Sequence, residues 1–282
     1  MKFPAATCGL VLPFFARSVL AGATYSLSDS IVGEGFYNAF NFEAIPDPTN
    51  GRVNYVDQAT AQSLNLTYAT SNTFIMRADD TTVLSSSGPG RNSVRIRTNN
   101  QYTTHVAVYV CKTAYCRIQL ARWRTLVRYN VRSPALTVLQ GEVDIVEGVN
   151  NVEPNQSTLH TSPSQCVVPE SLLPVKHDLL LLVNGNAGCG VKLTEDYNSF
   201  GPGFNNIGGG WYAIERTNNY ISIWFWERGD ASAPSDATSG AATIDTSNWG
   251  TPAAYFPNTD CDLATHFAAN GIIINLTFCE CS

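Results

Sequence analysis

The sequence is poor in charged residues, has no excess of basic charge and lacks a long uninterrupted apolar run. Charged side chains make up 14% of the 282 residues, and 17 Lys and Arg against 23 Asp and Glu leave a net charge of −6. Nucleic acids and anionic membrane surfaces repel such a chain, so we expect a neutral partner and neither of those two. A spanning helix needs about 20 apolar residues in a row, and helical repeats and phosphate-binding glycine loops are also missing.

The first residues have the layout of a secretory signal peptide. Lys2 precedes an apolar stretch at 10–15, and small residues follow at 21–23. We therefore expect a signal peptide at 1–22, a single domain at 23–282, and a secreted, extracellular monomer. Arg17 interrupts the apolar stretch, which argues against a membrane anchor. Three Asn-x-Ser/Thr sequons agree with export and predict a glycoprotein; they begin at Asn65, Asn155 and Asn275.

Seven cysteines remain after the expected signal, an odd number, so at least one is unpaired or bonded to another chain. For an oxidising compartment we favour disulfides between Cys166 and Cys189 and between Cys261 and Cys279. Each would close a loop of moderate length and remove entropy from the unfolded chain. The sequence does not establish this pairing.

Short runs of β-branched and aromatic residues alternate with Gly, Pro, Asn and Asp. The clearest runs occupy 52–57, 73–79, 93–98, 104–110, 141–148, 220–226 and 271–278. In the run at 93–98, alternation places Val94 and Ile96 on one face and Arg95 and Arg97 on the other. Many short strands without a long helix predict an all-β fold, a jelly-roll sandwich of two antiparallel sheets.

Two segments differ in composition from the rest of the chain. Residues 110–140 contain six basic side chains, no acid and almost no Gly or Pro, and residues 171–183 are apolar where a polar loop is expected. The second segment also fits a buried strand. We interpret both as reading-frame or splice errors in the gene sequence, or as lesions of a decaying gene.

Three carboxylates lie within six residues of an otherwise apolar strand at 141–148. Glu142 and Asp144 are two apart and share a face of a regular strand, whereas Glu147 is five from Glu142 and would point the other way. One extra residue, a β-bulge, would bring all three to one face, and bulges are frequent beside active sites. Repulsion between the acids lowers the stability of the fold, so their clustering indicates a functional site.

A pair of carboxyls on one face suits a retaining glycosidase, in which they lie about 5 to 5.5 Å apart. We predict Glu142 as the nucleophile, Glu147 as the acid/base, and Asp144 between them as the group that holds a proton or hydrogen bond. A solvated acidic edge or a Ca²⁺ site would use the same three residues.

The stretch GEVDIVEG resembles the Glu-x-Asp-x-x-Glu signature of glycoside hydrolase family 16. Further stretches look like its fungal laminarinase-type branch, including GRVNYVD, GPGRNSVRIR, STLHT, GGGWYAIERT and NWGTPAAYFPNTDCD, so the resemblance covers most of 24–279. It implies a concanavalin A-like jelly roll whose concave sheet forms a glucan cleft. It also implies a secreted endo-β-1,3(4)-glucanase without an obligatory cofactor or metal, with Glu142 and Glu147 as its catalytic pair.

By the same resemblance His160 lies beside the acids, and Arg91 and Tyr55 contact glucose units. Between the strand at 102–108 and the acidic strand, this branch carries a Trp-rich stretch that is replaced here, with only Trp123 left. The chain also ends before a closing segment of the branch. Loss of aromatic surface weakens sugar binding, so a catalytically impaired glucan-binding protein is one alternative. Glucan transfer, in which a sugar replaces water in the second step, is another.

Overall fold

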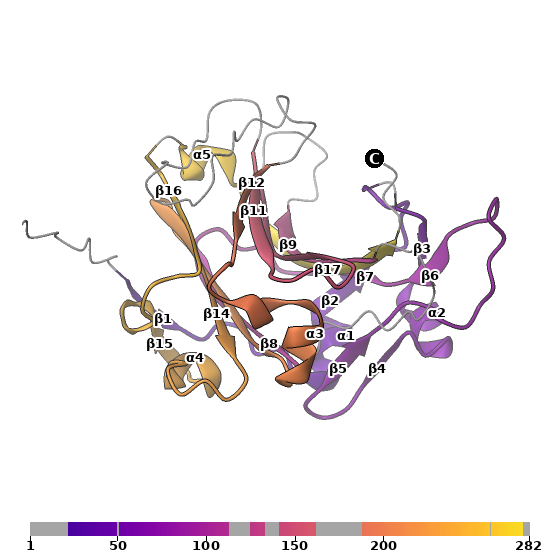
Figure 1. Ribbon diagram of the computed structural model, residues 1–282, viewed down its shortest axis with the longest axis horizontal. Helices are drawn as coiled ribbons and strands as arrows, with labels where there is room; N and C mark the ends of the chain where they lie inside the picture. The colour runs from indigo at the N-terminus through magenta and orange to yellow at the C-terminus, as the bar shows by residue number, and fades with distance from the viewer. Residues whose placement is uncertain are drawn as a thin grey trace, which may run out of the picture.

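The computed structural model describes residues 22–49, 51–112, 125–132, 141–161, 188–259 and 261–278 of the chain (Figure 1). Strands dominate these residues, and the longest helices among them have six residues, which confirms the predicted all-β class. Within these ranges, no helix has the length and apolar character that crossing a bilayer requires.

The larger sheet has seven strands, and every neighbouring pair is antiparallel. In spatial order these are β12 (Cys189–Lys192), β11 (Gln156–His160), β10 (Glu142–Val149), β9 (Thr125–Arg132), β17 (Gly271–Phe278), β7 (Arg95–Thr98) and β2 (Phe40–Phe42). The strand with the three acids, β10, therefore lies inside the sheet, where both of its edges are hydrogen-bonded.

The second sheet has four antiparallel strands. They are β16 (Ala254–Pro257), β14 (Tyr220–Glu227), β13 (Gly210–Arg216) and β8 (His105–Cys111). Three two-stranded pairs complete the strands: β1 (Thr24–Ser26) with β15 (Thr243–Asp245), β3 (Val53–Tyr55) with β6 (Arg91–Ser93), and β4 (Thr67–Ala69) with β5 (Phe74–Met76). The helices in the described part of the chain are short: α1 (Phe36–Ala39), α2 (Gln58–Ser63), α3 (Gly201–Asn206), α4 (Ser235–Thr238), α5 (Leu263–His266), and the 3-10 turns η1 (Gly33–Gly35), η3 (Tyr197–Ser199) and η4 (Thr246–Asn248).

One hydrophobic cluster joins the two main sheets. Val143 and Leu159 from the seven-stranded sheet pack in the same cluster as Ile214 and Ile223 from the four-stranded sheet, and all four are at most 3% exposed. Burial of such side chains contributes about 1.5 to 3 kcal/mol each. The apolar positions of β10 thus face the second sheet, and the acidic positions face away from it.

The alternation predicted at 93–98 is confirmed. Val94 and Ile96 are fully buried in a second cluster, whereas Arg95 and Arg97 each form a 2.8 Å ion pair with Glu43. The run is divided between β6 and β7. Arg95 is only 5% exposed because Glu43 compensates its charge.

Part of the compositionally distinct segment 110–140 forms a central strand. β9 pairs with β10 along one edge and with β17 along the other. Residues 113–124, 133–140 and the whole of 171–183 lie outside the described residues. Part of the segment that departs from the family pattern thus forms a regular strand between β10 and β17.

Two of the three predicted glycosylation sites are wrong for the folded chain. Asn155 is 1% exposed and Asn275 is fully buried, and both amides donate hydrogen bonds to the protein. A glycan would fit at neither position. Asn65 is exposed.

The cysteine predictions have different outcomes. Cys189 is a free, fully buried thiol, and burial raises its pKa to about 12, so the predicted bond to Cys166 is not formed. Cys261 is disulfide-bonded. Its predicted partner, Cys279, and Cys166 lie outside the described residues, so the pairing of Cys261 stays a prediction.

Candidate active site

A β-bulge interrupts β10 at the expected place. Asp144 pairs with Thr158 of β11 and Glu147 pairs with Gln156, so Ile145 and Val146 together stand opposite a single residue, Ser157. The register against β9 shifts at the same point. Both bulge residues are buried in the core cluster. The parity argument from the sequence is therefore confirmed.

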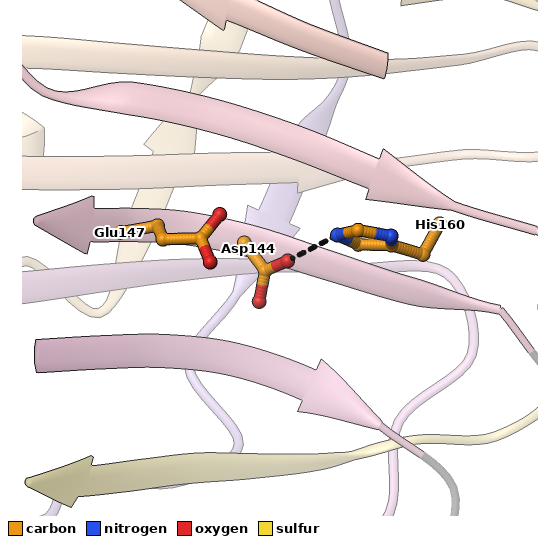
Figure 2. Close-up of side chains that lie close together, drawn as sticks. All are labelled: Asp144, Glu147 and His160. Carbon is orange, nitrogen blue, oxygen red and sulfur yellow. Dashed lines mark ion pairs between the residues drawn. The ribbon is translucent and has the colours of Figure 1, made fainter. Parts of the chain in front are cut away.

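Asp144, Glu147 and His160 come together on one side of the sheet (Figure 2). Their potential ligand atoms all lie within 4.8 Å of one another. Asp144 is completely buried, whereas Glu147 and His160 are partly exposed. Glu142 is the register partner of His160 and is partly exposed as well. The structure thus collects four of the six predicted site residues around β10 and β11.

His160 bonds to Asp144 across the two strands. Its Nε2 atom lies 3.0 Å from Oδ2 of Asp144. Burial by itself lowers the pKa of His160, but the hydrogen bond and charge of Asp144, and the charges of Glu142 and Glu147, outweigh burial and raise the pKa above its usual value. His160 therefore favours its cationic form and compensates part of the negative charge collected here.

Glu147 has a separate set of contacts. The hydroxyl of Thr158 donates a 3.3 Å hydrogen bond to Oε2 of Glu147, and the backbone N–H of Glu147 donates a 3.0 Å bond to the side-chain oxygen of Asn155. Asn155 also donates from its amide nitrogen to the carbonyl of Ile145, at 2.9 Å. The carboxyl group is thus approached from β11, and the backbone beneath it is held by a buried amide.

The same trio is the place where a metal ion would bind among the described residues. Two carboxylates and an imidazole suit Zn²⁺ better than Ca²⁺, which takes six to eight oxygen ligands. However, the ion pair between Asp144 and His160 already uses one ligand atom of each residue. The arrangement is better suited to moving protons than to holding a cation.

Arg91 and Tyr55 lie on neighbouring strands but outside this trio. Arg91 donates from one guanidinium nitrogen to the carbonyls of Asp79 and Thr82, at 2.8 and 3.0 Å. Tyr55 is 4% exposed and its hydroxyl accepts a 3.1 Å bond from Asn275; burial raises its pKa to about 12. Both side chains are engaged in packing contacts, and their contact with glucose units stays a prediction.

Asn155 and Ser157 are the residues that sequence reasoning missed. Both contact the bulge, yet in the sequence they form a sequon, which was interpreted only as a signal for export and glycosylation. The available signal was their position at the strand that pairs with the acidic one, since Asn155 directly precedes β11 and Ser157 lies within it. A buried Asn beside a predicted bulge is a reasonable candidate for a bridging role because it carries both a donor and an acceptor.

The two antiparallel sheets and the bulged strand define an all-β protein with a cluster of carboxylates on one face of its larger sheet. Residues 40–281 match the XgeA-like catalytic domain of glycoside hydrolase family 16. The chain belongs to glycoside hydrolase family 16.

Relatives agree with this assignment. An endo-1,3(4)-beta-glucanase of Arthroderma benhamiae is 35% identical over 283 residues, which cover 97% of this chain and 58% of the relative. A probable endo-1,3(4)-beta-glucanase of Neosartorya fischeri is 38% identical over 273 residues, which cover 91% of this chain and 38% of the relative. The chain thus spans less than two thirds of the length of these curated relatives.

Solved structures are similar over a larger share of their length. Laminarinase 16A of Phanerochaete chrysosporium, solved with β-glucans in its donor and acceptor sites, is 52% identical, with a TM-score of 0.84 over 91% of this chain and 85% of that one. An elongating family 16 β-1,3-glucosyltransferase is 30% identical, with a TM-score of 0.77 over 91% of this chain and 83% of the other.

Proposed function

We propose that the chain is a secreted, retaining endo-β-glucanase that hydrolyses β-1,3 or mixed β-1,3/1,4-glucans. The observation that carries the proposal is the bulge in β10, because it allows Glu142, Asp144 and Glu147 to share one face of the sheet. The similarity to a laminarinase and to an endo-1,3(4)-beta-glucanase supports the substrate class.

In this mechanism Glu142 attacks the anomeric carbon while Glu147 donates its proton to the leaving glycosidic oxygen. The bond between that oxygen and the anomeric carbon breaks, and a glycosyl ester on Glu142 forms. Glu147, now ionised, takes a proton from a water molecule, which attacks the anomeric carbon and releases Glu142. Two inversions give net retention, and no cofactor is consumed.

Asp144 and His160 would control the protons of this pair. The buried Asp144 lies on β10 between both catalytic groups, and it forms an ion pair with His160, the register partner of Glu142. Proton transfer at the pair would therefore take place beside a connected network of ionisable side chains.

The finer architecture belongs to the same proposal. The sheets form a jelly roll, the seven-stranded sheet provides the concave glucan cleft, and residues 23–282 form one catalytic domain that acts as a monomer after removal of the signal at 1–22. The face of β10 opposite the shared core supports this placement of the cleft.

Glucan transfer is the second candidate, because a family 16 β-1,3-glucosyltransferase is 30% identical to the chain. In a transferase, a sugar hydroxyl replaces water in the second step and the chemistry on Glu142 and Glu147 is unchanged. Longer oligosaccharides formed from laminari-oligosaccharides would identify it.

The test is to express the chain from Ala23 and to measure reducing ends released from laminarin and lichenan. Circular dichroism first establishes that the protein is folded, and Glu142→Gln serves as the matched control because it keeps the shape of the side chain. Release that the control abolishes supports the proposal. A folded protein that binds laminarin without releasing ends is a glucan-binding protein, and the glucanase proposal is then wrong.

A further inference from the structure

The bulge in β10 leaves backbone groups without their ladder partners, and side chains from the next strand satisfy them. Ile145 and Val146 oppose the single residue Ser157, so the regular exchange of N–H and C=O bonds fails there. The carbonyl of Ile145 accepts hydrogen bonds from the Ser157 hydroxyl and the Asn155 amide, each at 2.9 Å. These side-chain donors matter because a buried backbone carbonyl without a hydrogen-bond partner is destabilising.

Asn155 holds both ends of the bulge with one planar group. Its Nδ2 donates to the carbonyl of Ile145, and its Oδ1 accepts the N–H of Glu147, at 2.9 and 3.0 Å. The two bonds lie on either side of Val146. Because the carboxamide is rigid, it sets the separation between these two backbone atoms and hence the direction in which the Glu147 side chain leaves the strand.

The amide is itself fixed in place. The backbone N–H of Asn155 donates to the hydroxyl of Ser199 at 2.9 Å, and its carbonyl accepts from Leu193 at 2.9 Å. Asn155 and Ser199 are each 1% exposed. A buried side chain with both main-chain and side-chain partners has little freedom to move, so its influence on Glu147 is constant.

We propose that Asn155 is a positioning residue that orients Glu147 for proton donation, an inference that rests on the proposed role of Glu147 as acid/base. Ser157 is the natural comparison. It shares the Ile145 carbonyl with Asn155 and is fully buried, but it donates no bond to Glu147. Loss of Asn155 therefore misplaces the acid, whereas loss of Ser157 only weakens the bulge.

The test compares two leaving groups in Asn155→Ala, Ser157→Ala and the wild type. Laminarin needs protonation of its leaving oxygen, whereas a dinitrophenyl β-laminaribioside does not, because dinitrophenolate departs unaided. For Asn155→Ala we expect kcat/KM on laminarin to fall about 10- to 100-fold, as for a displacement of about 1 Å, with the aryl glycoside nearly unchanged. Ser157→Ala should affect both substrates equally.

Equal losses of kcat/KM on both substrates in Asn155→Ala, or no loss at all, would overturn the proposal. If that variant does not fold, as judged by circular dichroism, Ser199→Ala replaces it. This change removes the hydroxyl that holds the main chain of Asn155, and the same unequal loss is expected, with equal loss again counting against the proposal. Failure of the proposed function is separate, because the wild type would then release no reducing ends.

Discussion

His160 reaches diagonally across two strands to Asp144. Its register partner on β10 is Glu142, while Asp144 pairs with Thr158, and yet Nε2 of His160 lies 3.0 Å from Oδ2 of Asp144 (Figure 2). Diagonal neighbours in antiparallel sheets are about 7 to 8 Å apart at the backbone, within reach of long side chains. The His160 imidazole therefore forms an ion pair with Asp144, although its register partner in the predicted catalytic set is Glu142.

This ion pair predicts a pH dependence of stability. His160 binds its proton more tightly in the folded state, because its pKa there is raised, than in the unfolded chain, where the pKa is about 6.5. Its contribution to the free energy of unfolding is complete below pH about 6.5 and is lost as the pH rises through the raised value. Urea unfolding from pH 5 to 9 should show this decline in the wild type and a weaker one in His160→Gln.

The control for that measurement is Asp144→Asn. In its background the change His160→Gln should no longer reduce the decline as it does in the wild type, because the neutral amide removes the hydrogen bond and charge of Asp144, whereas burial and the charges of Glu142 and Glu147 remain. Identical pH profiles for the wild type and His160→Gln would contradict the raised pKa.

His105 predicts that the free energy of unfolding decreases as the pH falls, the opposite of the effect of His160. Burial lowers its pKa to about 4; the Thr103 carbonyl raises it slightly, and the charge of Arg216 lowers it further. The unfolded chain takes up this proton near pH 6.5 and the folded chain only near pH 4, so stability is lost as the pH falls between them. The loss should approach roughly 3 kcal/mol, and His105→Gln should remove it. Free energies of unfolding at pH 7 and 4.5 measure the difference. If the wild type and His105→Gln lose the same stability between these pH values, the lowered pKa of His105 is wrong.

Azide distinguishes the roles of the two glutamates. In Glu142→Ala, azide fills the space of the nucleophile and attacks directly, so an activated β-glycoside should give the α-glycosyl azide. In Glu147→Ala, azide attacks the ester on Glu142 and should give the β-glycosyl azide. Nuclear magnetic resonance of the products measures the anomer, and the reverse pattern would exchange the two assignments.

Glycosylation is expected at Asn65 alone among the three sequons. Asn65 is exposed, whereas the amides of Asn155 and Asn275 are buried and donate hydrogen bonds. Enzymatic removal of N-glycans from protein secreted by a eukaryotic host should lower the mass by one glycan. Asn65→Gln should secrete without a glycan, and a glycan that persists in this variant would show that another site is used.

Local pattern was sufficient to predict several of the strands and the face of the acids. Alternation placed Val94 and Ile96 inward, and counting positions from Glu142 to Glu147 required a bulge that the register confirms. Both arguments need only the period of a strand, which neighbouring residues determine.

Contacts between distant segments were not predictable in this way. Cys189 was paired on spacing, yet the thiol is free and buried. The Asn155 sequon was interpreted as a glycosylation signal, yet Asn155 is buried and its N–H donates to Ser199, 44 residues away. The unusual composition of 110–140 likewise hid a strand, because sheet position depends on the partners β10 and β17. The burial of these residues depends on contacts with distant segments, which the local pattern does not encode.

The bulge also determines which kinds of genetic change the site tolerates. Because one added residue reverses the facing of everything beyond it, deleting either Ile145 or Val146 would turn Glu147 toward the core and an apolar neighbour toward the opposite face. Substitutions along β10 change one side chain at a time, but a loss of three nucleotides would exchange inside and outside for the rest of the strand. In β10, a change in the number of residues therefore alters the facing of several side chains at once.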